Sequence, residues 1–159
     1  MDLNISLVFL LILTNEKVNE VEGDCQSMCS TFSLIVWKYV SNECFIVNIG
    51  DSRIYKVYDD NIVQLSRDDS IKGTSIVTNV IGMASPKIIV ERISFLENES
   101  IFLASDGFYN ARMSSFVNDI VQVCRNEDLN IGLNQLFSKY DINAQDDMTA
   151  LIIKNRNTT

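Results

Sequence analysis

Three places in the sequence put aspartates where an apolar, β-rich segment ends or begins. Asp51 follows the segment FIVNIG, Asp106 follows FLAS and precedes Gly107, and Asp146 and Asp147 precede the last apolar segment. Carboxylates at strand ends can converge on one rim of a sheet, and oxygen ligands without histidine or cysteine suit Mg²⁺ or Mn²⁺. Aspartate and glycine are also the usual residues of turns, so each place taken singly has a structural explanation as well.

The histidine and cysteine content of the chain excludes several classes of catalytic and metal site. The chain contains no histidine, which excludes Ser-His-Asp and Cys-His catalysis and histidine-based zinc sites. The four cysteines form no Cys-x-x-Cys pair, which argues against a zinc knuckle or a thioredoxin-type motif: Cys25, Cys29, Cys44 and Cys124. We expect them to be buried free thiols in a reducing compartment.

Length and charge indicate one acidic globular domain. A chain of 159 residues with 47% hydrophobic residues can bury a core of its own, and we expect a single domain over residues 1–159. The 21 acidic and 13 basic residues give a net charge of −8, whereas a protein that binds nucleic acid needs a basic face. Residues 7–13 are strongly apolar but much shorter than the roughly 20 residues that span a bilayer. We therefore expect a cytoplasmic protein with neither a membrane nor a nucleic acid as partner.

The pattern along the chain predicts the elements that must position these aspartates. Segments rich in β-branched and aromatic residues, bounded by turn residues, predict a meander of antiparallel strands at 30–40, 43–49, 53–58 and 62–65. Further strands are predicted at 87–93, 100–104 and 149–153, and helices at 3–21 and within 111–140. Strands followed by helices and a returning strand are typical of an α+β layered domain.

Five short motifs follow one another in a specific order: NIGDSR (48–53), LSRDDS (65–70), NVIG (79–82), FLASDG (102–107) and DDMT (146–149). In order and wording they resemble the motifs N-x-G-D-S-R, L-T-x-D-[HD]-S, R-A-L-G, L-x-S-D-G and D-N-x-T. These belong to the metal-dependent protein serine/threonine phosphatase family (PPM, type 2C). NVIG stands in this resemblance for the end of a helix. Residues 29–31 (CST) stand for the family's G-T-T strand, and the resemblance covers about residues 3–154.

The resemblance implies a PPM-phosphatase-like α/β/β/α sandwich of antiparallel sheets with a two-metal centre, where an activated water attacks phosphorus. Carried over residue by residue, it implies that Asp106 and Asp146 are ligands of Mn²⁺ or Mg²⁺. Asp68 is a candidate ligand of a further metal. Asp147 stands where the family has a non-ligand asparagine and is the weakest metal candidate. A structural role beside the site is implied for three residues: Asp51, Arg53 and Gly107.

Two parts of the family pattern have no match in this sequence. The first part precedes the matching motifs: it holds the family's phosphate-binding arginine and its Asp-Gly-x-Gly-Gly, whose aspartate bridges both metals. The second part is the family's mobile flap, for which residues 71–78 are too short. We therefore expect an N-terminally truncated domain, roughly the C-terminal two thirds of a PPM domain. Such a chain should bind metal weakly, show little activity by itself, and be poorly stable or associate through unpaired strand edges.

The predicted function is metal-dependent hydrolysis of phosphoserine and phosphothreonine by a PPM-type domain that is incomplete or inactive as given. The expected partners are a phosphoprotein substrate or a regulatory protein, together with a separately encoded N-terminal segment. The alternative is a non-catalytic, phosphatase-like binding module that keeps the fold and engages phosphoproteins. A generic α+β domain with turn aspartates is the third interpretation.

Overall fold

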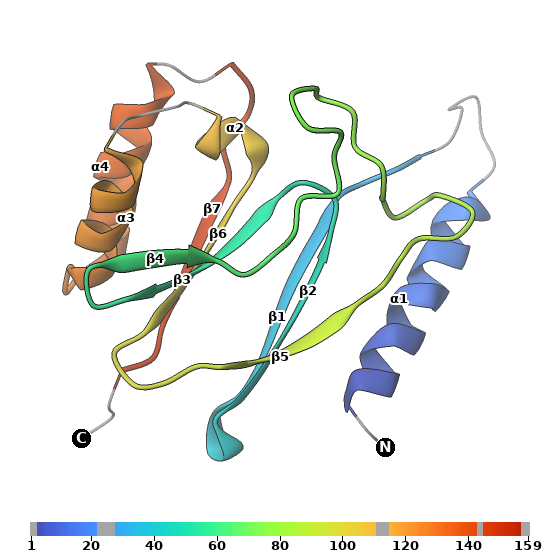
Figure 1. Cartoon of the computed structure of the whole chain (residues 1–159), viewed down its shortest axis with the longest axis horizontal. Coiled ribbons are helices and arrows are strands. Elements are labelled where there is room, and N and C mark those ends of the chain that lie inside the picture. Colours follow the sequence, from blue (N-terminus) through green and yellow to red (C-terminus); the bar gives the residue numbers. More distant parts are fainter. Residues whose placement is uncertain (1–2, 22–27, 111–114, 143–144, 157–159) are drawn as a thin grey trace. The chain divides into compact units, whose positions relative to one another are not determined.

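The computed structural model in Figure 1 describes residues 3–21, 28–110, 115–142 and 145–156. They fall into two compact units, one drawn from Met1–Ser52 and Arg67–Ser94 and the other from Arg53–Ser66 and Phe95–Thr159. Two antiparallel sheets and the helices that accompany them confirm the predicted α+β class.

The elements of the first unit are α1 (Leu3–Asn19), β1 (Phe32–Lys38), a 3₁₀ turn (Tyr39–Ser41), β2 (Glu43–Ile49) and β5 (Val90–Ser94). Those of the second are β3 (Arg53–Tyr58), β4 (Asn61–Gln64), β6 (Ser100–Ala104), α2 (Asp106–Tyr109), α3 (Phe116–Arg125), α4 (Leu129–Asp141) and β7 (Ala150–Lys154).

The first unit is a three-stranded sheet in the order β1-β2-β5, with α1 packed on one face. Leu34 lies opposite Val47, and Val47 lies opposite Val90, so these three side chains share a face of the sheet. Leu11 of α1 packs onto that face and is 2% exposed. Burial of the apolar face of α1 against β-branched side chains contributes to the stability of this unit.

The second unit is a four-stranded sheet in the order β4-β3-β6-β7, with α3 and α4 packed on one face. Its core is aromatic: Phe108 of α2 stacks on Tyr140 of α4 with ring centroids 5.0 Å apart, and Phe102 of β6 meets Phe108 edge-on at 5.5 Å. Helical spacing on α3 brings Ile120 and Cys124 into the same core. The core therefore ties α2, which begins at Asp106, to the sheet and to α4.

The predicted four-stranded meander is wrong, because β2 and β3 belong to different sheets. β2 pairs with β1 and β5, whereas β3 pairs with β4 and β6. The chain leaves the first sheet at Gly50, whose φ of 108° lies in the left-handed region that favours glycine. A Cβ at Gly50 would lie 2.5 Å from Thr31 Cγ2, so the close approach of two backbones also requires glycine here.

The helix end expected at residues 79–82 is also absent: residues 71–89 form no helix, and their β-pairing is limited to isolated bridges at Val77 and Ile81. Asparagine side chains fix this segment instead. Asn79 Nδ2 donates to Asp69 Oδ2 at 2.7 Å and to the Lys87 carbonyl at 2.9 Å, and Asn15 Oδ1 on α1 accepts from the Gly82 N–H at 2.7 Å. Such side-chain bonds to the backbone compete with helix formation, which explains the difference.

The other predicted elements agree with the structure to within a few residues. The strands at 43–49, 53–58 and 100–104 have the predicted bounds, while the strand expected at 87–93 begins at Val90. The prediction of buried thiols is confirmed for Cys44 and Cys124 but is wrong for Cys29, which is exposed, and Cys25 lies outside the described residues. Within the described part of the chain, no helix is both long and apolar enough to cross a membrane.

Candidate functional site

The candidate site lies at one end of the second sheet, where β6 ends and β7 begins. Ala104 pairs with Ala150, so the residues after β6 and the residues before β7 lie at the same edge of the sheet. This register places Asp106, the first residue of α2, and the Asp146–Asp147 segment at the same end of one compact unit. The sequence predicted two of these carboxylates as ligands, and the strand pairing supplies their common location.

Ser105 and Gly107 join the two segments. The Ser105 N–H donates to the Thr149 carbonyl at 3.0 Å, and the Thr149 N–H donates to Ser105 Oγ at 2.9 Å. A Cβ on Gly107 would lie 2.4 Å from the Asp147 carbonyl oxygen and 3.0 Å from that of Asp146. The backbone of residues 146–147 therefore packs directly on Gly107, and only glycine fits at this position without a shift.

Each of the two carboxylates is oriented by the backbone N–H of the next residue. Asp106 Oδ1 accepts from the Gly107 N–H at 2.9 Å, and Asp146 Oδ1 accepts from the Asp147 N–H at 2.8 Å. Among the described residues, neither side chain has a further hydrogen bond or an ion pair. The second oxygen of each carboxylate is therefore available to a cation.

Arg53 lies at the same end of the sheet. It pairs opposite Ala104 on the neighbouring strand, and its guanidinium lies over the ring of Tyr109 at 3.7 Å from the centroid. Arg53 Nη1 also approaches the Tyr55 hydroxyl at 3.4 Å. The cation–π contact braces α2, the helix that carries Asp106.

Asp51 and Asp68 belong to the other compact unit, where the segments that carry them are linked. The Asp69 N–H donates to the Gly50 carbonyl at 3.0 Å, and the Gly50 N–H approaches Asp69 Oδ2 at 3.4 Å. The turn that contains Asp51 is thus hydrogen-bonded to the segment that contains Asp68. The structure therefore brings Asp106 and Asp146 together in one unit, and the segments of Asp51 and Asp68 together in the other.

The donor chemistry suits a hard divalent cation, but the set of ligands is small. Among the residues that the structure describes, no group of three or more His, Cys, Asp or Glu side chains could hold a metal ion. Mg²⁺ is commonly bound through one or two carboxylates and keeps several waters. Asp106 and Asp146 fit that manner of binding.

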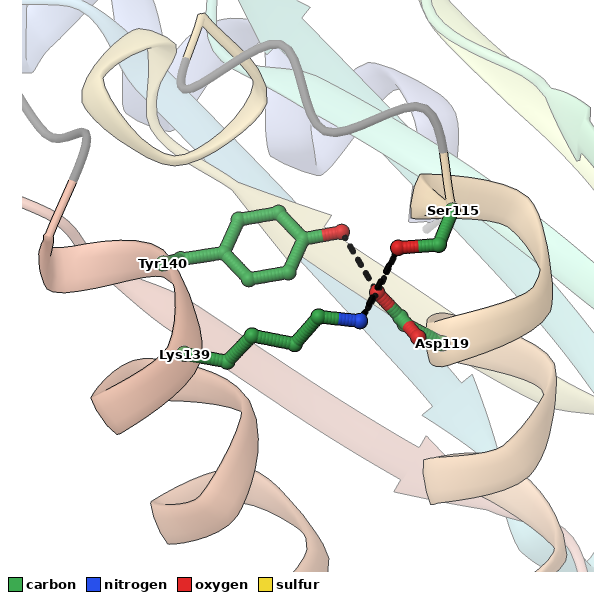
Figure 2. A network of polar contacts seen from close by, with 4 residues as sticks. All are labelled: Ser115, Asp119, Lys139 and Tyr140. Carbon is green, nitrogen blue, oxygen red and sulfur yellow. Dashed lines mark hydrogen bonds and ion pairs between the residues drawn. The ribbon is translucent and has the colours of Figure 1, made fainter.

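A different carboxylate, Asp119, is committed to structure. Its Oδ2 accepts from Lys139 Nζ at 2.6 Å, Ser115 Oγ at 2.7 Å and the Tyr140 hydroxyl at 3.2 Å, which link α3 to α4 (Figure 2). Burial acts to raise the pKa of Asp119, but the hydrogen bonds from Lys139 and Ser115, the Lys139 charge and the Tyr140 hydroxyl together lower that pKa below its ordinary value. This network was not found from the sequence, because its members lie on two helices whose packing no local pattern specifies.

Comparison with solved structures decides the fold. The serine/threonine phosphatase PstP/Ppp of Mycobacterium tuberculosis matches with a TM-score of 0.85 and 18% identity, over 99% of this chain and 74% of that chain. The PPM Ser-Thr phosphatase MsPP from Mycobacterium smegmatis matches with a TM-score of 0.79 and 20% identity, over 96% of this chain and 74% of that one. This chain has the fold of the PPM-type serine/threonine phosphatases.

A third structure with the PPM fold is PppA of Pseudomonas aeruginosa, described as a key regulatory component of T6SS. It matches with a TM-score of 0.81 and 23% identity, over 94% of this chain and 68% of that chain. The catalytic domain of PstP has also been solved in complex with two manganese ions. No protein-family profile and no curated protein matches the sequence. The PPM fold expected from five short motifs is therefore confirmed by three-dimensional similarity at low sequence identity.

Proposed function

We propose that this chain is a domain of a PPM-type protein serine/threonine phosphatase, which hydrolyses phosphoserine and phosphothreonine with Mn²⁺ or Mg²⁺. A fold by itself does not decide function, so the proposal depends on the site. The observation that carries it is the juxtaposition of Asp106 and Asp146 on two segments joined through Ser105 and Gly107. Both carboxylates stand at the positions that the family resemblance assigns to metal ligands.

In this proposal the residues of the chain hold and orient the cation. Asp106 and Asp146 each offer one carboxylate oxygen while the other is fixed by a backbone N–H. Arg53 and Tyr109 hold α2, and therefore Asp106, at the edge of the sheet. A bound divalent cation lowers the pKa of a coordinated water and offsets the negative charge that develops on a phosphoryl group. Asp147 contributes its backbone to the packing on Gly107.

Two carboxylates give weak metal affinity, so full activity requires further ligands from outside the described residues. We propose that a separately encoded N-terminal segment supplies them, and that a phosphoprotein is the substrate or the regulated partner. Loss of one interaction that is made only in the transition state raises the activation free energy by about 3 kcal/mol. Residues 1–159 alone should therefore show little or no hydrolysis of p-nitrophenyl phosphate.

Mn²⁺ titration of the full chain, followed by electron paramagnetic resonance of the free ion, tests the site. We expect weak binding that is lost in Asp106→Asn and in Asp146→Asn. The matched control is Asp141→Asn, an exposed aspartate at the end of α4, which should bind as the unchanged chain does. Equal Mn²⁺ binding by all four proteins would show that Asp106 and Asp146 are not ligands.

The activity is tested by adding a PPM segment that carries Asp-Gly-x-Gly-Gly to residues 1–159. Mn²⁺-dependent hydrolysis of a phosphoserine peptide should appear, and it should disappear in Asp106→Asn. Phosphopeptide binding without hydrolysis, with or without the added segment, would instead favour the non-catalytic binding module.

A further inference from the structure

Strand β7 forms one edge of the second sheet, where it pairs with β6 and, among the described residues, with no other strand. The Ser105 N–H donates to the Thr149 carbonyl at one end of this pair of strands, and the Asn155 N–H donates to the Glu99 carbonyl at the other. Residues of an antiparallel pair turn their backbone groups alternately toward the neighbouring strand and away from it. Residues 149, 151, 153 and 155 therefore face β6, and residues 150, 152 and 154 direct their N–H and C=O groups to the open edge.

The open edge of β7 lacks the devices that usually prevent another strand from pairing there. Residues 150–154 contain no proline, and their pairing with β6 runs without a bulge. The charge at the end of the strand is turned aside, because Lys154 Nζ donates to the Cys124 carbonyl on α3 at 2.7 Å. Proteins ordinarily protect an exposed edge with prolines, bulges or charges. The edge of β7 is therefore suited to the addition of an extended strand through backbone hydrogen bonds.

The direction of β7 brings its open edge to the candidate metal site. β7 begins at Ala150, shortly after Asp146, and β6 ends at Ala104, shortly before Asp106. A strand that pairs antiparallel with the open edge of β7 runs in the same direction as β6, so it ends at the same end of the sheet. Residues that follow such a strand reach the site from the side of β7, as Asp106 reaches it from the side of β6. The other edge strand, β4, is separated from β6 by β3 and does not border the site.

The needs of the site indicate which strand fits this edge. Among the described residues, no group of three or more potential metal ligands is present, so an occupant that brings ligands is required. A second copy of this chain does not bring them. Its β7, paired antiparallel around Ile152, would carry its own Asp146 past Lys154 to the far end of the sheet, and the net charge of −8 opposes self-association.

The PPM fold itself contains more chain than these 159 residues. The match to PstP/Ppp covers 99% of this chain and 74% of that chain, so about a quarter of that structure has no counterpart here. We propose that an extended strand of the N-terminal segment pairs antiparallel with the open edge of β7, and that the residues after this strand complete the metal site. The inference rests on the proposed function, in which that segment supplies the missing ligands, and it adds where and how the segment binds.

Hydrogen exchange of the full chain, followed by NMR, tests the place of binding. In the chain alone, the N–H of Ile152 should exchange rapidly, whereas those of Leu151 and Ile153, which face β6, should exchange slowly. A PPM segment that contains a strand followed by Asp-Gly-x-Gly-Gly should slow exchange at Ile152 by at least about tenfold. Failure of the segment to bind, or its binding with exchange at Ile152 unchanged, would overturn the proposal. Slowing at Ile152 that depends on the concentration of the chain alone would replace the segment by a second copy.

A proline at the open edge tests the backbone contact. Ala150→Pro removes an N–H that points away from β6, and proline is tolerated at the first residue of an edge strand, so the melting temperature should change little. Binding of the segment, measured by calorimetry in metal-free buffer, should weaken by at least about tenfold, since the ring also blocks the incoming strand. Ala150→Ser is the matched control, because it keeps the N–H and nearly the same size, and it should bind as the unchanged chain does. Equal binding by both variants would contradict strand addition at β7.

A segment in which the aspartate of Asp-Gly-x-Gly-Gly is replaced by asparagine separates this inference from the proposed function. It should bind and slow exchange at Ile152 as the unchanged segment does, because the contact is made by the backbone, but it should not support Mn²⁺-dependent hydrolysis. Slowed exchange at Ile152 without hydrolysis by the unchanged segment would refute the proposed activity and leave the docking at β7 standing. Hydrolysis restored by a segment that leaves Ile152 unprotected would support the activity and overturn the docking.

Discussion

Lys139 Nζ lies 2.6 Å from Asp119 Oδ2 and connects α4 to α3. The Asp119 side chain is 14% exposed and the Lys139 side chain is 43% exposed, so the ion pair lies at the edge of the core with its acidic partner mostly buried. The same carboxylate oxygen accepts from the hydroxyl of Tyr140, whose ring stacks on Phe108. Asp119 therefore helps to fix the aromatic stack that anchors α2, the helix that begins at Asp106.

Replacement of Asp119 by asparagine should lower the free energy of unfolding. The change keeps the size of the side chain but removes the charge that Lys139 neutralises and leaves two further donors with a weaker acceptor. The loss of a charged hydrogen-bond acceptor in a mostly buried position costs about 1–3 kcal/mol. Urea denaturation followed by circular dichroism measures the free energy of unfolding. Asp141→Asn, an exposed aspartate on the same helix as Lys139, should change little, and an equal loss in both variants would contradict the role given to Asp119.

The stability that Asp119 contributes should depend on pH. Because its pKa is lower in the folded protein than in the unfolded chain, its contribution is fully present above the unfolded value, about 3.9, and is lost as the pH falls through the folded value. The difference in unfolding free energy between the unchanged chain and Asp119→Asn should therefore be constant near neutral pH and shrink in acid below about pH 4. A difference that stays constant down to the lowest pH would show that the charge of Asp119 is unimportant.

Gly107→Ala should destabilise the second unit and weaken Mn²⁺ binding together. The added Cβ would lie 2.4 Å from the Asp147 carbonyl oxygen, which belongs to a backbone that is hydrogen-bonded to Ser105 and cannot shift easily. Overpacking of this kind costs about 1–3 kcal/mol. Gly132→Ala on α4 is the control, because its nearest neighbour is a methyl group of Val123 at 3.1 Å and alanine favours a helix. Thermal melts in which both variants behave alike would count against the close packing at Gly107.

Thiol reactivity should separate the cysteines by their environment. Burial raises the pKa of Cys44 and of Cys124 to about 11, so both remain protonated and unreactive near pH 8. Cys29 is exposed and should react with a disulfide reagent in the folded protein. In a Cys25→Ser background, one thiol should be titrated without denaturant and the other two only after unfolding. Rapid reaction of Cys124 in the folded chain would show that α3 does not remain packed on its sheet.

Local pattern determined much of the secondary structure. The strands at 43–49, 53–58 and 100–104 could be predicted with their bounds, because β-branched and aromatic runs between turn residues specify extended backbone without information from distant residues. Five motifs in order were enough to indicate the PPM fold by resemblance, and four of them adjoin the end or the start of a strand. Asp106 and Asp146 could be singled out in the same way, as carboxylates at strand ends.

Tertiary structure decided what local pattern could not specify. The change of sheet at Gly50 depends on the close approach of Thr31, which lies nineteen residues earlier in the chain. The irregular course of residues 71–89 depends in part on Asn15 of α1, whose side chain accepts a hydrogen bond from the Gly82 backbone. The common location of Asp106 and Asp146 follows from the pairing of Ala104 with Ala150, a register that forms only when β6 and β7 meet. The physical reason is the same in each case: these arrangements are fixed by contacts between segments far apart in the chain, whose pairing energy is absent from any local window of sequence.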